Sequence, residues 1–208
     1  MRGKGNVLLG LLVIVLVFST FYSYMQFRRI HESQLFLHQL EQRLDEWIGR
    51  IGALKECRFN EILLNGTNID TDFSVRDIQE HEKKISEIIL DNTLILRYSE
   101  MHCEVCVDSI VSKLNAYKDS IGLQHIVLLT TSMNFGYIKR FKKINKIPFS
   151  IYNMSKALDS VLVDIGMPYL FIYSTHSKRI NNMFVPQEEN PQLTDEYLHS
   201  VLMKYYID

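Results

Sequence analysis

Cysteine, proline and excess charge are all scarce in this sequence of 208 residues. Three cysteines are too few for the disulfide framework of a small secreted fold. Four prolines and nine glycines exclude a low-complexity or collagen-like chain. Basic and acidic residues number 23 and 24, so the net charge of −1 gives no electrostatic reason to expect nucleic acid as a partner. A hydrophobic content of 47% suffices for one globular domain with additional segments.

The N-terminal segment has no charged residue from Val7 to Tyr24. That length is close to what a helix needs to cross a bilayer. Bulky residues surround its few serines, so no small-x-small cleavage site is evident. We therefore expect residues 1–25 to form an uncleaved anchor rather than a buried core helix. If the short tail stays in the cytoplasm, the chain crosses the membrane once and its remainder lies outside, which in a Gram-negative cell would be the periplasmic side of the inner membrane.

Residues 26–58 carry an apolar heptad pattern that predicts a helical stalk. Its two sets of positions are Ile30, Leu37, Leu44, Ile51 and Ser33, Leu40, Trp47, Leu54. Two structures fit this pattern: a parallel coiled coil that pairs two copies of the chain through residues 30–57, and an amphipathic helix that lies on its own domain. Cys57 closes the segment; it could bridge two chains, but a free thiol is the simpler expectation.

The segment after the stalk contains turn and helix signals. Asn65-Gly66 lies between apolar runs, which predicts a β-hairpin over residues 59–70. Apolar residues from Val75 to Ile89 recur at spacings typical of a helix, so residues 74–90 are predicted to be helical.

From residue 93 the apolar pattern alternates between strand and helix. The expected strands are residues 93–98, 125–131, 148–152, and a hairpin of 167–173 with 179–185; the expected helices follow at 107–117, at 135–144 and after Thr194. This order predicts an α/β domain in which helices cover both faces of a central sheet.

Cys103 and Cys106 lie where the first of these strands meets a helix. Two intervening residues at a first helical turn bring the side chains onto one face, close enough for a disulfide. The first sulfur then lies near unpaired backbone N–H groups and the positive end of the helix, which favour a thiolate. We expect Cys103 to be the exposed nucleophile and Cys106 the less accessible resolving thiol.

The stretches LILRYSEMHCEVC and GMPYLFIY, with the hairpin and final helix, resemble the thioredoxin-like family, especially membrane-tethered bacterial members. The resemblance implies that residues 59–208 form a three-layer α/β/α sandwich with a mixed central sheet. It also implies that Pro168 is a cis-proline facing the cysteine pair, and that Met167 and Pro168 border the substrate groove.

Several residues depart from the family pattern. His102 precedes the pair, and Glu104 lies inside it, so we expect opposite effects on thiolate formation from a protonated imidazole and a carboxylate. Arg97 occupies the place where the family often has a buried acid. Glu100 is the candidate substitute for that acid.

The function expected from these features is thiol–disulfide exchange with protein clients of the periplasm. Cys103 and Cys106 would be the catalytic residues and would alternate between a dithiol and a disulfide. No organic cofactor and no metal is expected, and a membrane electron donor would supply the reductant.

Two alternatives remain at this point. The first is a copper or other soft-metal chaperone, with Cys103, Cys106 and His102 as ligands and His125 or His176 as a distant fourth. The second is a non-catalytic interaction module, in which both cysteines could be replaced without loss.

Overall fold

The computed structural model describes the backbone of residues 3–207 and the side chains of residues 12 and 14–207. The chain divides into two compact units, residues 1–55 and residues 56–208. One helix, α1 (Gly3–Leu64), makes up the first unit and continues into the second. The stalk predicted over residues 26–58 is therefore helical throughout.

No helix within residues 3–207 contains a stretch long and apolar enough to cross a membrane. Residues 3–25 of the predicted anchor belong to α1, but the side chains of residues 1–11 and 13 are outside those that the structure describes. The membrane anchor accordingly stays a prediction.

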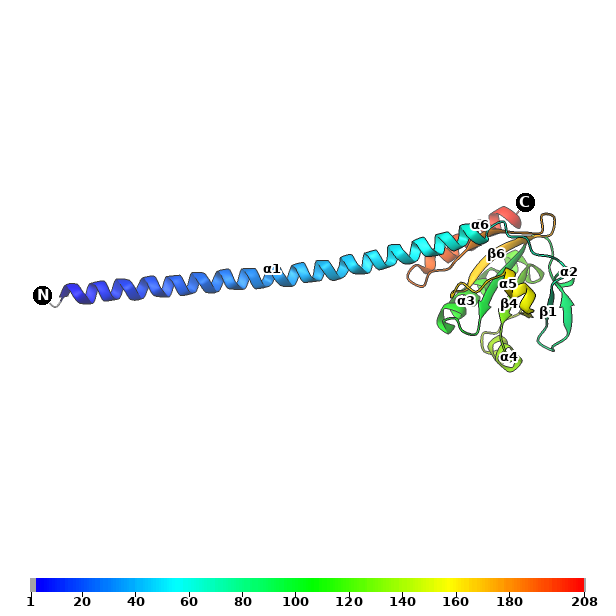
Figure 1. Ribbon diagram of the computed structural model, residues 1–208, viewed down its shortest axis with the longest axis horizontal. Coiled ribbons are helices and arrows are strands. Elements are labelled where there is room, and N and C mark those ends of the chain that lie inside the picture. Colours follow the sequence, from blue (N-terminus) through cyan, green and yellow to red (C-terminus); the bar gives the residue numbers. More distant parts are fainter. Residues whose placement is uncertain (1–2, 208) are drawn as a thin grey trace. The chain divides into compact units, whose positions relative to one another are not determined.

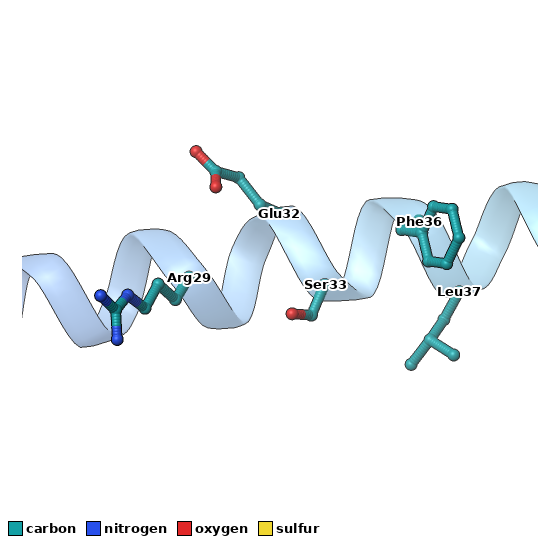
Figure 2. A pocket seen from close by; sticks show the side chains of 5 residues that line it. All are labelled: Arg29, Glu32, Ser33, Phe36 and Leu37. Carbon is teal, nitrogen blue, oxygen red and sulfur yellow. The ribbon is translucent and has the colours of Figure 1, made fainter.

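The apolar heptad positions of α1 are exposed. Leu37 and Leu44 are 57% and 60% exposed, and Trp47 is 59% exposed. Figure 2 shows Phe36 and Leu37 projecting from the helix, and the hollow that they line together with Arg29, Glu32 and Ser33 is bordered by α1 alone. A pairing of two copies through these positions stays a prediction.

The second unit is built around one mixed sheet of seven strands, in the order β2-β1-β5-β4-β3-β6-β7 (Figure 1). The strands are β1 (Ser74–Arg76), β2 (Glu82–Lys84), β3 (Thr93–Ser99), β4 (Ile126–Thr131), β5 (Ser150–Met154), β6 (Tyr169–Ser174) and β7 (Arg179–Phe184). The central strands β3, β4 and β5 run parallel, and the flanking strands β1, β6 and β7 pair antiparallel. The mixed sheet and the hairpin of β6 and β7 confirm the predictions.

Helices cover both faces of the sheet. They are α2 (Ile85–Ile88), α3 (Glu104–Ile121), the 3₁₀ turn η1 (Leu123–His125), α4 (Phe135–Ile144), α5 (Lys156–Val161) and α6 (Pro191–Tyr205). One core cluster joins α3, α4 and α6 to the sheet; the other joins α2, α5 and the end of α1 to the opposite face. The alternation of inward-facing residues along β3 explains the two cores, because Leu94 and Leu96 enter the first and Ile95 the second. The three-layer α/β/α architecture is therefore confirmed.

Two predictions before residue 93 are wrong. Asn65-Gly66 does not turn a hairpin but follows the end of α1, where Gly66 has a φ of +87° and donates its N–H to Ile180. Residues 74–90 do not form one helix but contain β1, β2 and the short α2. Antiparallel pairing of Val75 with Met154 of β5 decides the conformation there, and local helical spacing cannot reveal it.

Cys57 belongs to the second unit and is buried in its core at 4% exposure. Burial raises the pKa of its thiol, as do the charges of Glu61 and Glu56. It is a free thiol facing the core, which removes the ground for a bridge between two chains.

Candidate functional site

Cys103 and Cys106 lie at the junction of β3 and α3, as predicted. Cys103 is the exposed residue preceding α3, and its carbonyl accepts the N–H of Val107 at 3.1 Å. Cys106 lies in the first turn of α3 and is partly buried. The geometry therefore gives the two thiols unequal access to a large substrate.

Both cysteines are free thiols, and a third group stands beside them. The two sulfurs and a carboxylate oxygen of Glu188 all lie within 4.8 Å of one another. The Cys106 thiol donates to Oε2 of Glu188 at 3.6 Å. Sequence reasoning missed Glu188, because it lies 82 residues away in the loop between β7 and α6 and no local pattern marks it.

The surroundings of Cys106 disfavour its thiolate. Burial is the largest cause, followed by the hydrogen bond and charge of Cys103 and then by Glu188; together they raise the pKa of Cys106 to about 12. Cys106 is therefore a protonated thiol near neutral pH. A protonated and less accessible Cys106 fits the expectation that the exposed Cys103 reacts first.

His102 is buried with both ring nitrogens bonded. Its Nδ1 accepts the backbone N–H of Ser99 at 3.2 Å, and its Nε2 lies 2.8 Å from Oδ1 of Asp164. Acceptance at Nδ1 places the proton on Nε2, which donates to the carboxylate. His102 therefore fixes the loop in front of Cys103, and its nitrogens are not available as metal ligands beside the sulfurs.

Arg97 is fully buried next to this histidine and binds two carboxylates. Its Nη2 donates to Asp159 at 2.9 Å, and its Nη1 forms an ion pair with Asp164 at 3.1 Å. Nε donates to the carbonyl oxygen of Leu162 at 3.2 Å. The Nη1 contact is not aligned as a hydrogen bond and is an ion pair. A buried cation, held by two carboxylates and one carbonyl oxygen, thus occupies the place where the resemblance implies a buried acid.

Asp164 connects His102 with Arg97, because its carboxylate contacts both side chains. Partial burial acts to raise its pKa, but hydrogen bonds from His102 and from the N–H of Gly166, with the charge of Arg97, hold the pKa well below its ordinary value. Asp164 is therefore ionised throughout the physiological range. Sequence reasoning missed both Asp159 and Asp164, whose partners lie about sixty positions earlier in the chain.

Of the two glutamates predicted to modulate the site, Glu100 is hydrogen-bonded to neighbouring residues and Glu104 is exposed. Glu100 accepts hydrogen bonds from the Ser132 hydroxyl and from the N–H of Met133, so it fastens the end of β3 to the loop after β4. Glu104 is the exposed first residue of α3. Its carboxylate lies near the positive end of that helix, which it partly neutralises.

Met167 and Pro168 lead directly into β6, and Pro168 is buried. Tyr169 pairs with Arg97 across the two strands, so this loop lies at the same end of the sheet as the cysteine pair. The prediction of a cis-proline is wrong, because residues 3–207 contain no cis peptide bond. The turn into β6 is made by Gly166 instead, with a φ of +78° and its N–H bound to Asp164.

The distant histidines do not reach the pair. His125 lies just before β4 and His176 just after β6, at the opposite end of the sheet from the end of β3. Within the described residues, the group able to hold a metal ion consists of Cys103, Cys106 and Glu188.

Comparisons with known proteins place the fold. No protein-family model matches the chain, and no curated protein does either. Among solved structures, a protein from Chlorobium tepidum described as a thiol:disulfide interchange protein DsbE matches with a TM-score of 0.52 and 13% identity, over 66% of this chain and 97% of that one.

Two further structures have lower TM-scores. A thioredoxin-like protein from Porphyromonas gingivalis matches at 0.49 and 12% identity, over 64% of this chain and 92% of its own. Peroxidoxin BcpB from Mycobacterium tuberculosis also matches at 0.49 and 12% identity, over 68% and 97%. At such identities the likeness concerns the fold alone. It is the Chlorobium structure, with a TM-score of 0.52, that supports the assignment of the fold. The chain has a thioredoxin-like fold.

Proposed function

We propose that this protein, with its thioredoxin-like fold, is a thiol–disulfide oxidoreductase that uses Cys103 and Cys106. One observation carries the proposal: an exposed thiol precedes α3, and a second, less accessible thiol lies beside it in the first turn. Disulfide exchange needs one sulfur that can meet a foreign disulfide and another that can release it.

Exchange proceeds in two displacements. The Cys103 thiolate attacks one sulfur of the client disulfide, forming a Cys103–client bond while the other client sulfur leaves as a thiolate. Cys106 then attacks Cys103, the Cys103–client bond breaks, and the second client sulfur leaves. Two electrons pass from the protein to the client, and a dithiol of a membrane electron donor restores Cys103 and Cys106.

The start of α3 supports the first displacement. Unpaired N–H groups and the positive helix end stabilise negative charge on Cys103, while Glu104 offsets part of that effect. The substrate groove is proposed to lie at the loop of Met167 and Pro168, which is at the same end of the sheet as the cysteine pair.

We further propose that the domain is tethered to a bacterial inner membrane and acts on periplasmic proteins. The uncharged run from Val7 to Tyr24 supports the anchor. A tether would raise the effective concentration of the thiols near other membrane proteins, including the electron donor.

Reduction of insulin by dithiothreitol tests the proposed activity. The full chain should accelerate the reaction, and Cys103→Ala should abolish the acceleration. Cys57→Ala, which removes the buried thiol, is the matched control and should retain it. Equal rates for the full chain and for Cys103→Ala would refute the activity.

A soft-metal site is the second candidate, and the cluster of Cys103, Cys106 and Glu188 favours it. Two thiolates and a carboxylate can bind zinc or copper, with one position left open. Here Glu188 takes the ligand place that sequence reasoning gave to His102. Stoichiometric binding of one ion at a physiological free concentration, lost in Glu188→Gln, would support this candidate.

A further inference from the structure

We propose that Glu188 is the proton acceptor for Cys106 in the resolving displacement; this inference rests on the proposed oxidoreductase function. The Cys106 thiol donates a hydrogen bond to the Glu188 carboxylate at 3.6 Å. The step it would serve is the one in which Cys106 must lose a proton in order to attack Cys103.

The other acids near the pair are already engaged. Asp164 binds His102 and Arg97, and Glu100 binds Ser132 and the N–H of Met133. Glu104 lies on the exposed side of the helix start. Within the described residues, Glu188 is therefore the acid whose carboxylate directly accepts a hydrogen bond from a sulfur of the pair.

Cys106 needs a proton acceptor because a thiol must lose its proton as its sulfur bonds to Cys103, and the Cys106 thiol donates its hydrogen bond to Glu188. In the mixed disulfide Cys103 no longer carries charge, but burial and Glu188 still oppose a free thiolate. A thiol of high pKa is intrinsically a strong nucleophile once deprotonated, so removing its proton during the attack gives a large advantage.

The loop that carries Glu188 is held at both ends. At its start, the N–H of Val185 donates to Oε1 of Glu61 on α1, and Gln187 lies beside the Cys57 thiol. At its end, the N–H of Asn190 donates to the carbonyl oxygen of Gln187, and α6 begins at Pro191. Glu188 is thus presented to Cys106 by an anchored loop.

Cys106 passes its proton to a carboxylate oxygen of Glu188 as its sulfur bonds to Cys103. The bond between Cys103 and the client sulfur breaks, and the client leaves as a thiolate. The proton on Glu188 then passes to that thiolate or to water, which restores the carboxylate. The client sulfur receives the electron pair, and the protein is left with a Cys103–Cys106 disulfide.

A stopped-flow reaction with dipyridyl disulfide separates the two displacements. Attack by Cys103 releases one thiopyridone, and attack by Cys106 releases a second. The probe is neutral, so its encounter with Cys103 does not depend on the charge of residue 188. A Cys57→Ala background removes the third thiol.

Glu188→Gln should slow the second release by about 100-fold, the low end of what a positioned acid–base group contributes, and leave the first release unchanged. Glu189→Gln, which removes the same charge one residue away, should slow neither. If Glu188 acted only by its charge, its removal would lower the pKa of Cys106 and the second release would become faster. An unchanged or faster second release in Glu188→Gln therefore overturns the proposal.

The pH dependence gives a second readout. The titratable groups that bear on Cys106 are Cys103 beside it and Glu188 from the loop. In Glu188→Gln the second rate should rise about tenfold per pH unit, as expected for a free thiolate, whereas the parent rate should rise less steeply. Parallel profiles would also overturn the proposal. If the parent protein releases only one thiopyridone, the oxidoreductase function itself fails instead.

Discussion

At the scale of single residues, the unusual feature is Arg97, a fully buried arginine near the end of β3. Burying a charge costs several kcal/mol unless partners compensate. Arg97 is compensated by Asp159, Asp164 and the carbonyl oxygen of Leu162. The same Asp164 binds His102, so the network ties the loop before Cys103 to the loop before β6. We interpret Arg97 as a structural residue and not as a replacement for a proton-handling acid.

Asp164→Asn should lower the free energy of unfolding by about 1–2 kcal/mol at neutral pH, since the carboxylate is partly exposed and Arg97 keeps Asp159. The pKa of Asp164 is depressed in the folded state, so its stabilisation is present above the unfolded pKa of about 4 and is lost as pH falls through the folded pKa. Urea denaturation from pH 7 down to pH 2 should therefore show the difference from the parent shrinking below about pH 4.

Asp119→Asn is the control, because Asp119 is exposed on α3 and its substitution changes the net charge by the same amount as Asp164→Asn. It should change the unfolding free energy by less than about 0.5 kcal/mol. An Asp164→Asn effect that grows at acid pH would contradict the assignment of Asp164 as an ionised, stabilising partner.

The site could be predicted from sequence only where its residues are neighbours. Cys103, Cys106 and their place at a strand-to-helix junction follow from a local pattern. Asp159, Asp164 and Glu188 meet the site through long-range packing, so no spacing in the sequence marks them. The conformation of Pro168 could not be fixed either, because the nearby turn at Gly166 depends on the Asp164 contact.

At the scale of elements, the end of α1 is part of the folded unit and protects an edge of the sheet. The outer strand β7 would expose unpaired backbone groups. Glu61 accepts the N–H of Val185, Asn65 accepts that of Met183, and Thr67 accepts that of Ile180. The opposite edge strand, β2, is charged throughout its three residues. Both edges are therefore protected against pairing with another chain.

Leu64→Ala should lower the free energy of unfolding by about 2–4 kcal/mol, because Leu64 is buried in the core at 5% exposure. Leu63→Ala is the matched control: its side chain is 63% exposed, and its loss should cost less than about 0.5 kcal/mol. Chemical denaturation of both variants provides the comparison. Equal effects would mean that the end of α1 does not pack on the sheet.

Most elements after residue 93 were predictable because their apolar runs are periodic. The helix α5 (Lys156–Val161) was missed, because its six residues bury only Leu158 and leave no periodic pattern. The helix at Phe135–Ile144 has the bounds that its sequence predicts. The final helix begins at Pro191 and not after Thr194, whose side chain is buried within it. Residues 59–90 were misread because their strands are three residues long and depend on partners far along the chain.

At the scale of the whole molecule, the first unit is a helix with an uncovered apolar stripe. We predict that two copies pair through it, because the heptad positions from Ile30 to Leu54 are the ones a coiled coil buries. Leu37→Glu should weaken association by more than about tenfold, since it places a charge in the seam. Sedimentation equilibrium of the full chain in mild detergent measures this effect.

Leu35→Glu is the control for that experiment. Leu35 is equally apolar and 53% exposed, but it lies on the face opposite the seam. It should leave association unchanged. A parent chain that is monomeric at all concentrations would contradict the predicted pairing, without affecting the proposed chemistry of the second unit.

The covalent trapping of a disulfide-bonded peptide tests the central claim most directly. Cys106→Ser should accumulate a mixed disulfide between Cys103 and the peptide, identified by peptide mapping and mass spectrometry, because the resolving thiol is gone. Cys103→Ser should accumulate none, and the parent chain should end with a Cys103–Cys106 bond and a released peptide dithiol. An adduct on Cys57, or none on Cys103, would contradict the account.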